Sequence, residues 1–255
     1  MNFHVVTLFP EVIDSYTKAS ILGRAQEEKI ISVQTYQLRD FVQNPSKSQK
    51  DLGAGKWGYK KVDERPYGGG PGMVLQAEPF VRAVEAIQKD IQGSARRRLA
   101  TAKKEVRVLI TAPGGKQLTN AYAKKLTKQS DVIILCGRYE GIDARVKKIL
   151  KAGMLADVKV SVEEVSTGDY VLTGGEVPAL AIVDATARQI PGVLGKCESL
   201  EESRASSPEV YTRPEVLEHA DAQGKIKKYR VPKVLLSGDH AKMDAWRNQK
   251  RGKSA

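Results

Sequence analysis

One stretch of the chain decides the fold class: Val132-Ile-Ile-Leu-Cys-Gly-Arg-Tyr-Glu-Gly141. Its first four residues form an apolar run with the length of a buried strand, and a glycine-rich loop follows directly. The residues from Ile142 to Leu150 then favour a helix. Strand, loop and helix in this order form the repeating unit of parallel α/β sheets, so the stretch predicts an α/β protein.

The same order recurs on both sides of this stretch. Strands are predicted over residues 3–8, 106–110 and 158–165, and helices after Pro10, through Phe80, Val84, Ile87 and Ile91, and over residues 120–128. The polar, serine-rich segment 196–210 is typical of a linker. We therefore predict a domain over residues 1–195 and a small, mostly helical unit over residues 211–255, with Thr212 and Pro214 at the start of its first helix.

Three glycine-bearing loops follow predicted strands, at residues 111–115, 136–141 and 167–176. In parallel sheets, ligands bind outside the carboxyl ends of the strands, and glycine lets the backbone approach a flat ligand closely. One such loop alone is most often only a turn, but three together favour a pocket for a nucleoside cofactor. Neither a Walker-type phosphate loop nor a Rossmann glycine fingerprint is present.

The formal net charge of +12 favours a polyanionic partner, with RNA or DNA ahead of an anionic membrane, although a merely solvated basic surface would give the same charge. Basic residues concentrate at 89–107 and 225–253 without the aromatic interleaving of a stacking platform, which favours structured RNA. The two cysteines and three scattered histidines indicate neither a zinc site nor a disulfide framework. We expect a cytoplasmic protein with no membrane span.

Six motifs, in the same order, resemble those of the bacterial tRNA (guanine-N1)-methyltransferase family, the TrmD-type members of the SPOUT methyltransferases. They are Leu8-Phe-Pro-Glu11, Asp63-Glu-Arg-Pro-Tyr-Gly-Gly-Gly-Pro-Gly-Met73, Cys136-Gly-Arg-Tyr-Glu-Gly-Ile-Asp143, Gly168-Asp-Tyr-Val-Leu-Thr-Gly-Gly-Glu176, Ile190-Pro-Gly-Val-Leu-Gly195 and Tyr211-Thr-Arg-Pro214. The resemblance implies a SPOUT-type sheet with a trefoil knot over roughly residues 111–178. It also implies a homodimer with shared active sites, bound S-adenosylmethionine, and methylation of N1 of guanosine 37, just 3′ of the anticodon of tRNA.

The resemblance also assigns site residues. A cofactor site is expected from Thr111, Ala112, Pro113, Gly137, Tyr139, Glu140, Ser166, Thr167, Gly168, Asp169, Tyr170, Val171, Leu172, Gly174, Gly175 and Pro178. RNA contacts are expected from Arg65, Tyr67, Gly69, Arg188 and Arg213. Two residues of the family motifs, Tyr139 and Asp63, have ordinary structural alternatives. Core packing would equally explain Tyr139, and an ion pair with Arg65 would equally explain Asp63.

The chemistry sets two requirements. Guanine N1 carries a proton at neutral pH, so methyl transfer needs a base and a positive group near O6. The resemblance assigns Arg188 to O6, while a surface ion pair with Asp184 is the alternative. The reaction requires no metal, and a magnesium ion is compatible with it.

The general base is a departure from the family, whose linker supplies an aspartate, because no aspartate occurs between Lys196 and Thr212. We favour Glu202 or Glu209 as the base; the alternatives are Asp63 or Glu140 acting through water, and weak or lost catalysis. The other departures are an insertion at 53–61, a longer stretch at 149–165 and a C-terminal unit shorter than the family's. Two further functions therefore stay open: an RNA-binding module that keeps the cofactor pocket, and a methyltransferase for another RNA position.

Overall fold

The computed structural model describes residues 1–43, 60–97, 104–153, 158–194 and 209–251 of the chain. Most of the insertion at 53–61 and most of the predicted linker, including Glu202, therefore lie outside the described residues. The chain divides into two compact units, Met1–Gly195 and Lys196–Ala255. Each unit has its own arrangement of helices and strands.

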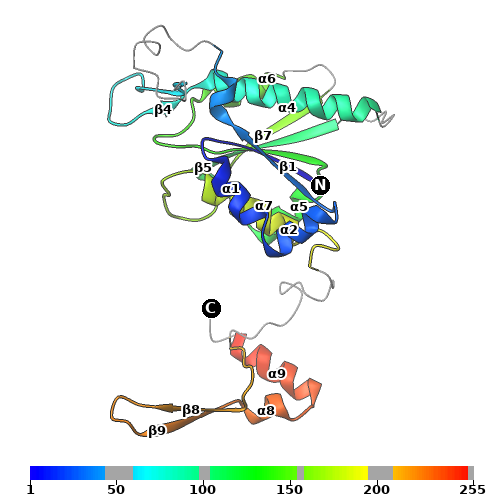
Figure 1. Cartoon of the computed structure of the whole chain (residues 1–255), viewed down its shortest axis with the longest axis vertical. Coiled ribbons are helices and arrows are strands. Elements are labelled where there is room, and N and C mark those ends of the chain that lie inside the picture. The colour runs from blue at the N-terminus through cyan, green and yellow to red at the C-terminus, as the bar shows by residue number, and fades with distance from the viewer. Residues whose placement is uncertain (44–59, 98–103, 154–157, 195–208, 252–255) are drawn as a thin grey trace. The chain divides into compact units, whose positions relative to one another are not determined.

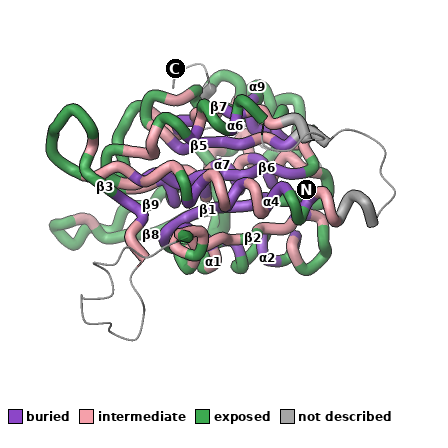
Figure 2. Tube along the Cα trace, turned by 90° about the horizontal axis from the view of Figure 1, so that it is seen from above, coloured by how far each residue is buried: buried purple, intermediate pink, exposed green. Residues whose placement is uncertain are grey.

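The first unit is built on a five-stranded sheet in the order β2-β1-β6-β5-β7. Its strands are β1 (Asn2–Thr7), β2 (Ser32–Gln37), β5 (Lys104–Gln117), β6 (Asp131–Leu135) and β7 (Val158–Ser166), and every neighbouring pair is parallel. All five residues of β6 are buried, and the tube in Figure 2 shows the central strands as the buried layer. The parallel α/β sheet predicted from the run at 132–135 is thus confirmed.

Helices cover both faces of this sheet (Figure 1). Helices α4 (Ala77–Arg97) and α6 (Arg145–Ala152) pack on one face, with the short 3-10 turn η1 (Leu38–Phe41). Helices α1 (Pro10–Thr17), α2 (Ser20–Glu27), α5 (Asn120–Leu126) and α7 (Glu176–Ala187) pack on the other. The predicted helix face of Phe80, Val84, Ile87 and Ile91 is buried in the first of these two cores.

A small antiparallel pair, β3 (Asp63–Glu64) and β4 (Val74–Leu75), stands beside the sheet. It is attached to the loop after β6 by backbone hydrogen bonds: Leu75 N–H donates to Gly141 C=O (3.0 Å) and Glu140 N–H to Met73 C=O (3.1 Å). The glycine-rich loop between β3 and β4 is therefore held next to residues 140–141.

The second unit differs from its prediction. Instead of a helix beginning at Thr212, strand β8 (Val216–Ala220) pairs antiparallel with β9 (Ile226–Arg230), and helices α8 (Lys233–Leu236) and α9 (His240–Arg251) follow. The helix prediction was wrong because it relied on Thr212 and Pro214 and overlooked the turn at 221–224, which closes a hairpin. Trp246 lies in α9, and its ring centroid is 6.3 Å from that of Tyr211.

Candidate cofactor site

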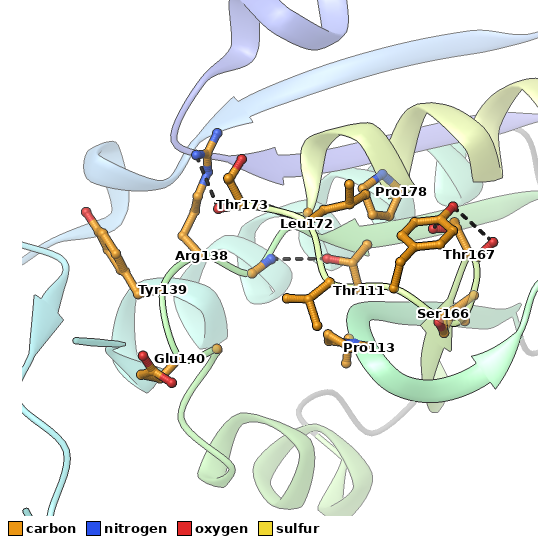
Figure 3. A pocket seen from close by; sticks show the side chains of 18 residues that line it. Thr111, Pro113, Arg138, Tyr139, Glu140, Ser166, Thr167, Leu172, Thr173 and Pro178 are labelled. Carbon is orange, nitrogen blue, oxygen red and sulfur yellow. Dashed lines mark hydrogen bonds between the residues drawn. The ribbon is translucent and has the colours of Figure 1, made fainter. Parts of the chain in front are cut away.

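A cavity of about 240 Å³ opens at the carboxyl ends of β6 and β7, beside the irregular part of β5 that begins at Thr111, where its register with β7 shifts (Figure 3). The three glycine-bearing loops predicted from the sequence form its walls. All the residues predicted for the cofactor line this cavity except Gly168 and Asp169. Sequence reasoning missed four others, which lie within or next to the same motifs: Arg138, Gly141, Val165 and Thr173.

Close backbone contacts hold the loops together. Gly175 N–H donates to Gly137 C=O at 2.7 Å, and Gly137 N–H donates to Thr111 Oγ1 at 3.1 Å. Thr111 Oγ1 in turn donates to Leu135 C=O at 3.2 Å. A Cβ atom on Gly175 would lie 2.1 Å from Thr111 Oγ1, so only glycine permits this approach.

A buried ion pair lies behind the cavity wall. Glu176, the first residue of α7, is 2% exposed; its Oε1 accepts a hydrogen bond from Thr7 Oγ1 at 2.7 Å, and its Oε2 lies 3.0 Å from Arg138 Nη2. The Arg138 guanidinium carbon also stands 4.5 Å from the centroid of the Phe9 ring, within cation–π range. Arg138 thus joins the loop after β6 to strand β1 and helix α7.

Cys136 stands next to this network at the end of β6. Burial raises the pKa of its thiol well above the ordinary value; the nearby Glu176 charge adds to the increase, and Arg138 and a hydrogen bond with Thr7 partly oppose it. The thiol therefore stays protonated at neutral pH. It packs in the core and is a poor nucleophile.

The rim of the cavity carries exposed apolar side chains. Tyr170 is 56% exposed, Val171 80% and Leu172 41%, on the loop before α7. Tyr139, on the loop after β6, is also 56% exposed and has a positive φ of 57°. Core packing does not explain Tyr139. Apolar groups around a cavity with backbone polar groups in its walls are typical of ligand sites.

Arg188 and Asp63, the two residues predicted for catalysis that the structure describes in the first unit, do not line this cavity. Arg188 caps the C-terminal end of α7, whereas the N-terminal end of α7 stands at the cavity. Twelve helical residues separate the two ends by about 18 Å. Asp184, one turn before Arg188, accepts a hydrogen bond from Tyr16 Oη at 2.5 Å, and this bond raises the pKa of Tyr16.

The remaining predicted residues lie on other elements. Asp63 is 7% exposed in β3, while Arg65 and Tyr67 are exposed on the loop that follows it, and Gly69 in that loop has a φ of 79°. In the second unit, Glu209 accepts a hydrogen bond from Tyr211 Oη at 2.9 Å, and Arg213 is exposed.

The described part of the chain lacks both a metal-binding cluster and a membrane-spanning helix. Within it, no three His, Cys, Asp or Glu side chains gather in a way that could hold a metal ion. No helix in these residues has the length and apolar character needed to cross a membrane.

The fold and site define a class, a parallel α/β protein with a ligand cavity formed by glycine-bearing loops at the carboxyl edge of its sheet. Comparison with known proteins identifies the family. The chain belongs to the tRNA (Guanine-1)-methyltransferase TrmD family, whose model matches residues 1–255. The resemblance inferred from the six motifs is confirmed.

Similar proteins from several bacteria carry the name tRNA (guanine-N(1)-)-methyltransferase. The protein of Clostridioides difficile (strain 630) is 38% identical, covering 98% of this chain and 91% of the relative. The protein of Ruminiclostridium cellulolyticum is 39% identical and covers 98% of this chain and 90% of the relative. The protein of Geobacter metallireducens is 37% identical and covers 98% of this chain and 86% of the relative. The similarity therefore extends over nearly the whole of each protein.

Proposed function

We propose that the chain is an S-adenosylmethionine-dependent methyltransferase that modifies N1 of guanosine 37 in tRNA, in the cytoplasm. The observation that carries this proposal is the cavity built from three stretches, 111–113, 137–141 and 165–175, in a chain that belongs to the family throughout its length. The second and third of these stretches overlap motifs that the chain shares with the family. The excess of basic residues suits a tRNA substrate.

The cavity suits this cofactor. Apolar groups of Val165, Leu172 and Pro178 offer contact to a flat base, and the glycines of the same loops leave backbone groups accessible for hydrogen bonds. When bound, S-adenosylmethionine supplies a methyl group that is already activated on sulfur. The protein then has to align the guanine and manage its charge and its proton.

The chain's own residues are assigned two tasks. Arg188 donates to guanine O6 and stabilises the negative charge that develops there as N1 attacks the methyl carbon. A carboxylate accepts the N1 proton, and Glu202 or Glu209 is the candidate. Arg65, Tyr67, Gly69 and Arg213 are proposed to contact the RNA, and all four are exposed.

We further propose a homodimer in which each active site combines groups from two subunits. Two observations support this arrangement. Arg188 lies about a helix length from the cavity of its own chain. A row of exposed apolar side chains lies at helical spacing along α1 and just before it: Phe9 (37% exposed), Val12 (36%) and Tyr16 (49%). Val177, on the adjoining helix α7, is 58% exposed. Such an apolar surface suits an interface between copies.

The SPOUT-type trefoil knot belongs to the same proposal. The chain leaves β7, and the loop at 167–175 returns to pack against the loop after β6, where Gly175 bonds to Gly137. This return supports a knotted path through the cofactor loops.

Labelled methyl transfer tests the proposal. The full-length chain, S-adenosylmethionine and an unmodified tRNA transcript with guanosine at position 37 should yield 1-methylguanosine, identified after nuclease digestion. A transcript with adenosine at position 37 is the control and should give no such product. Cofactor and tRNA binding without transfer would support the binding-module alternative, and a methylated nucleoside at another position would support another RNA target.

The assignment of the base has its own test. If Glu202 or Glu209 is the base, one of the variants Glu202→Gln and Glu209→Gln should lower turnover by roughly 100-fold or more, because general-base catalysis commonly contributes that much. Cofactor affinity, measured by calorimetry, should stay nearly unchanged. Wild-type turnover in both variants would exclude the two glutamates and direct attention to Asp63 and Glu140.

A further inference from the structure

The second unit contains a two-stranded hairpin that is exposed on both faces. All residues of β9, and all of β8 except the partly buried Val216, are exposed. The apolar side chains Leu217, Ile226 and Tyr229 keep 57%, 63% and 55% of their surface in solvent. An isolated pair of strands is marginally stable in water, so exposed apolar groups on such a ribbon indicate a partner.

The register of the hairpin sorts its side chains into two faces. Leu217 pairs with Tyr229, and His219 pairs with Lys227, so these four residues project from one face. We call these four residues the ring face. The other face carries Ile226 and Lys228, opposite Ala220 and Glu218.

The ring face combines two exposed aromatic rings with a cation. Tyr229 and His219 occupy diagonal positions across the two strands, and Lys227 stands opposite His219. Aromatic rings stack on unpaired bases, while lysine pairs with the phosphates between them. His219 and Tyr229 are ten positions apart in the chain, so the two rings come together only when the strands pair.

The turn of the hairpin is well ordered. Asp221 Oδ1 accepts hydrogen bonds from the backbone N–H groups of Gln223 (3.1 Å) and Lys225 (2.9 Å), and Gly224 takes a φ of 78°. Asp221 Oδ2 also lies 3.4 Å from Lys227 Nζ. The turn therefore fixes the register and, with it, the composition of the ring face before any partner binds.

Charge decides between an RNA and a protein partner. Residues 216–230 hold four Lys or Arg against two Asp or Glu, which suits a polyanion better than a second copy of this basic chain. We propose that the ring face binds unpaired nucleotides of the tRNA substrate, with bases stacked on Tyr229 and His219 and a phosphate at Lys227. The inference rests on the proposed function for the choice of RNA.

Affinity of the full-length chain for an unmodified tRNA transcript, measured by filter binding, tests the ring face. Tyr229→Ala should weaken binding by roughly 5- to 150-fold, the usual range for one stacked base. Ile226→Ala removes a comparably exposed side chain from the other face and should change affinity less than about twofold. Tyr229→Phe should restore binding, and Tyr229→Thr, which keeps the preference for strand, should not.

The two lysines provide a second matched pair. Lys227 and Lys228 each lie near one carboxylate of β8 or the turn, but on opposite faces. Lys227→Gln should reduce the salt dependence of binding by roughly one phosphate contact, whereas Lys228→Gln should leave it as in the wild type. Equal losses for both lysines would show only a diffuse attraction and would overturn the proposal.

The remaining outcomes separate this inference from the enzyme proposal. If the wild type forms 1-methylguanosine and Tyr229→Thr binds tRNA normally, the hairpin proposal is wrong and the enzyme proposal stands. If the wild type forms no 1-methylguanosine, yet Tyr229→Thr weakens tRNA binding, the enzyme proposal is wrong and the hairpin proposal stands. A change in sedimentation of Tyr229→Thr without RNA, at unchanged tRNA affinity, would show that a second copy covers the ring face.

Discussion

Glu176 is nearly fully buried where strand β1, helix α7 and the loop after β6 meet. Its two carboxylate oxygens contact Thr7 and Arg138, which lie far from it in the chain. A buried charge in such a position is tolerated because Oε1 accepts a hydrogen bond from Thr7 and Oε2 lies beside the positive guanidinium of Arg138. The same contacts fix the Arg138 side chain, whose Nη1 reaches Thr173 C=O at 3.5 Å.

We predict that Glu176→Gln destabilises the first unit. The amide oxygen can still accept from Thr7, but the negative charge beside Arg138 is lost, so the free energy of unfolding should fall by about 1–3 kcal/mol, the range for leaving a buried polar group without its partner. Urea unfolding measures the difference. Glu140→Gln, at an exposed position on the same loop, is the control and should stay within about 0.5 kcal/mol of the wild type. Equal unfolding midpoints for Glu176→Gln and the control would rule out a structural role for the pair.

This network also marks the limit of prediction from sequence at the level of residues. Most of the residues that line the cavity could be predicted because they fall in three continuous stretches of the chain, 111–113, 137–141 and 165–178. The partnership of Thr7, Arg138 and Glu176 depends on β1, β6 and α7 lying side by side. No spacing in the chain records that proximity, so only the folded structure reveals it.

Elements with a clear pattern of apolar residues were predicted well, whereas the two strands joined by the turn at 221–224 were not. Strand β6 is apolar from Val132 to Leu135 because both of its faces are covered, and α4 buries residues at helical spacing. Strand β8 has no buried face to impose a period, since most of its side chains are exposed. Its conformation depends on the turn at 221–224 and on pairing with β9.

Helix α5 is tied to strand β7 by Tyr122 Oη, which donates to Glu163 Oε2 at 2.5 Å. Burial alone would raise the pKa of Glu163, but the hydrogen bond from Tyr122 and the charges of Arg107, Lys116 and Lys125 outweigh burial and lower the pKa. A lowered carboxyl pKa stabilises the folded state above the unfolded pKa, and this contribution is lost as pH falls through the folded value.

We therefore predict a pH-dependent effect of Tyr122→Phe. At pH 7 the variant should lose about 1–2 kcal/mol of unfolding free energy, because a hydrogen bond to a charged group is removed. The difference from the wild type should shrink as the pH falls below 4.5, the ordinary pKa of a glutamate carboxyl, and on through the lower pKa that Glu163 has in the folded state. Urea titrations at pH 7 and pH 3 measure it. A difference that is the same at both pH values would contradict a charged acceptor.

The approach of the loop before α7 to the loop after β6 is the element-level feature on which the cavity depends. Gly175→Ala places a methyl group against Thr111 and should part the two loops. We expect cofactor affinity to fall by roughly 5- to 150-fold, as overpacking of this kind commonly costs about 1–3 kcal/mol. Gly114→Ala is the matched control, since its added Cβ meets nothing within 4 Å. Similar calorimetric affinities for the two variants would show that the contact does not shape the site.

At the scale of the whole molecule, the role proposed for Arg188 requires an arrangement that brings this arginine to a cavity. The arginine and the cavity lie at opposite ends of α7, so one chain does not bring them together along that helix. In a symmetric dimer, one subunit could supply Arg188 to the cavity of the other. Arg188→Ala and Gly175→Ala would then damage different halves of the same site.

This arrangement predicts recovery of activity in mixed dimers. Each variant alone should be nearly inactive in methyl transfer, but co-expression of the two should restore roughly a quarter of wild-type activity, because half of the dimers are mixed and each has one intact site. Differently tagged chains allow the mixed dimer to be purified and assayed, and Gly114→Ala paired with Arg188→Ala serves as a comparison with an undamaged cavity. An isolated mixed dimer of Arg188→Ala and Gly175→Ala without activity would mean that Arg188 acts within its own chain, by a movement that brings the end of α7 to the cavity.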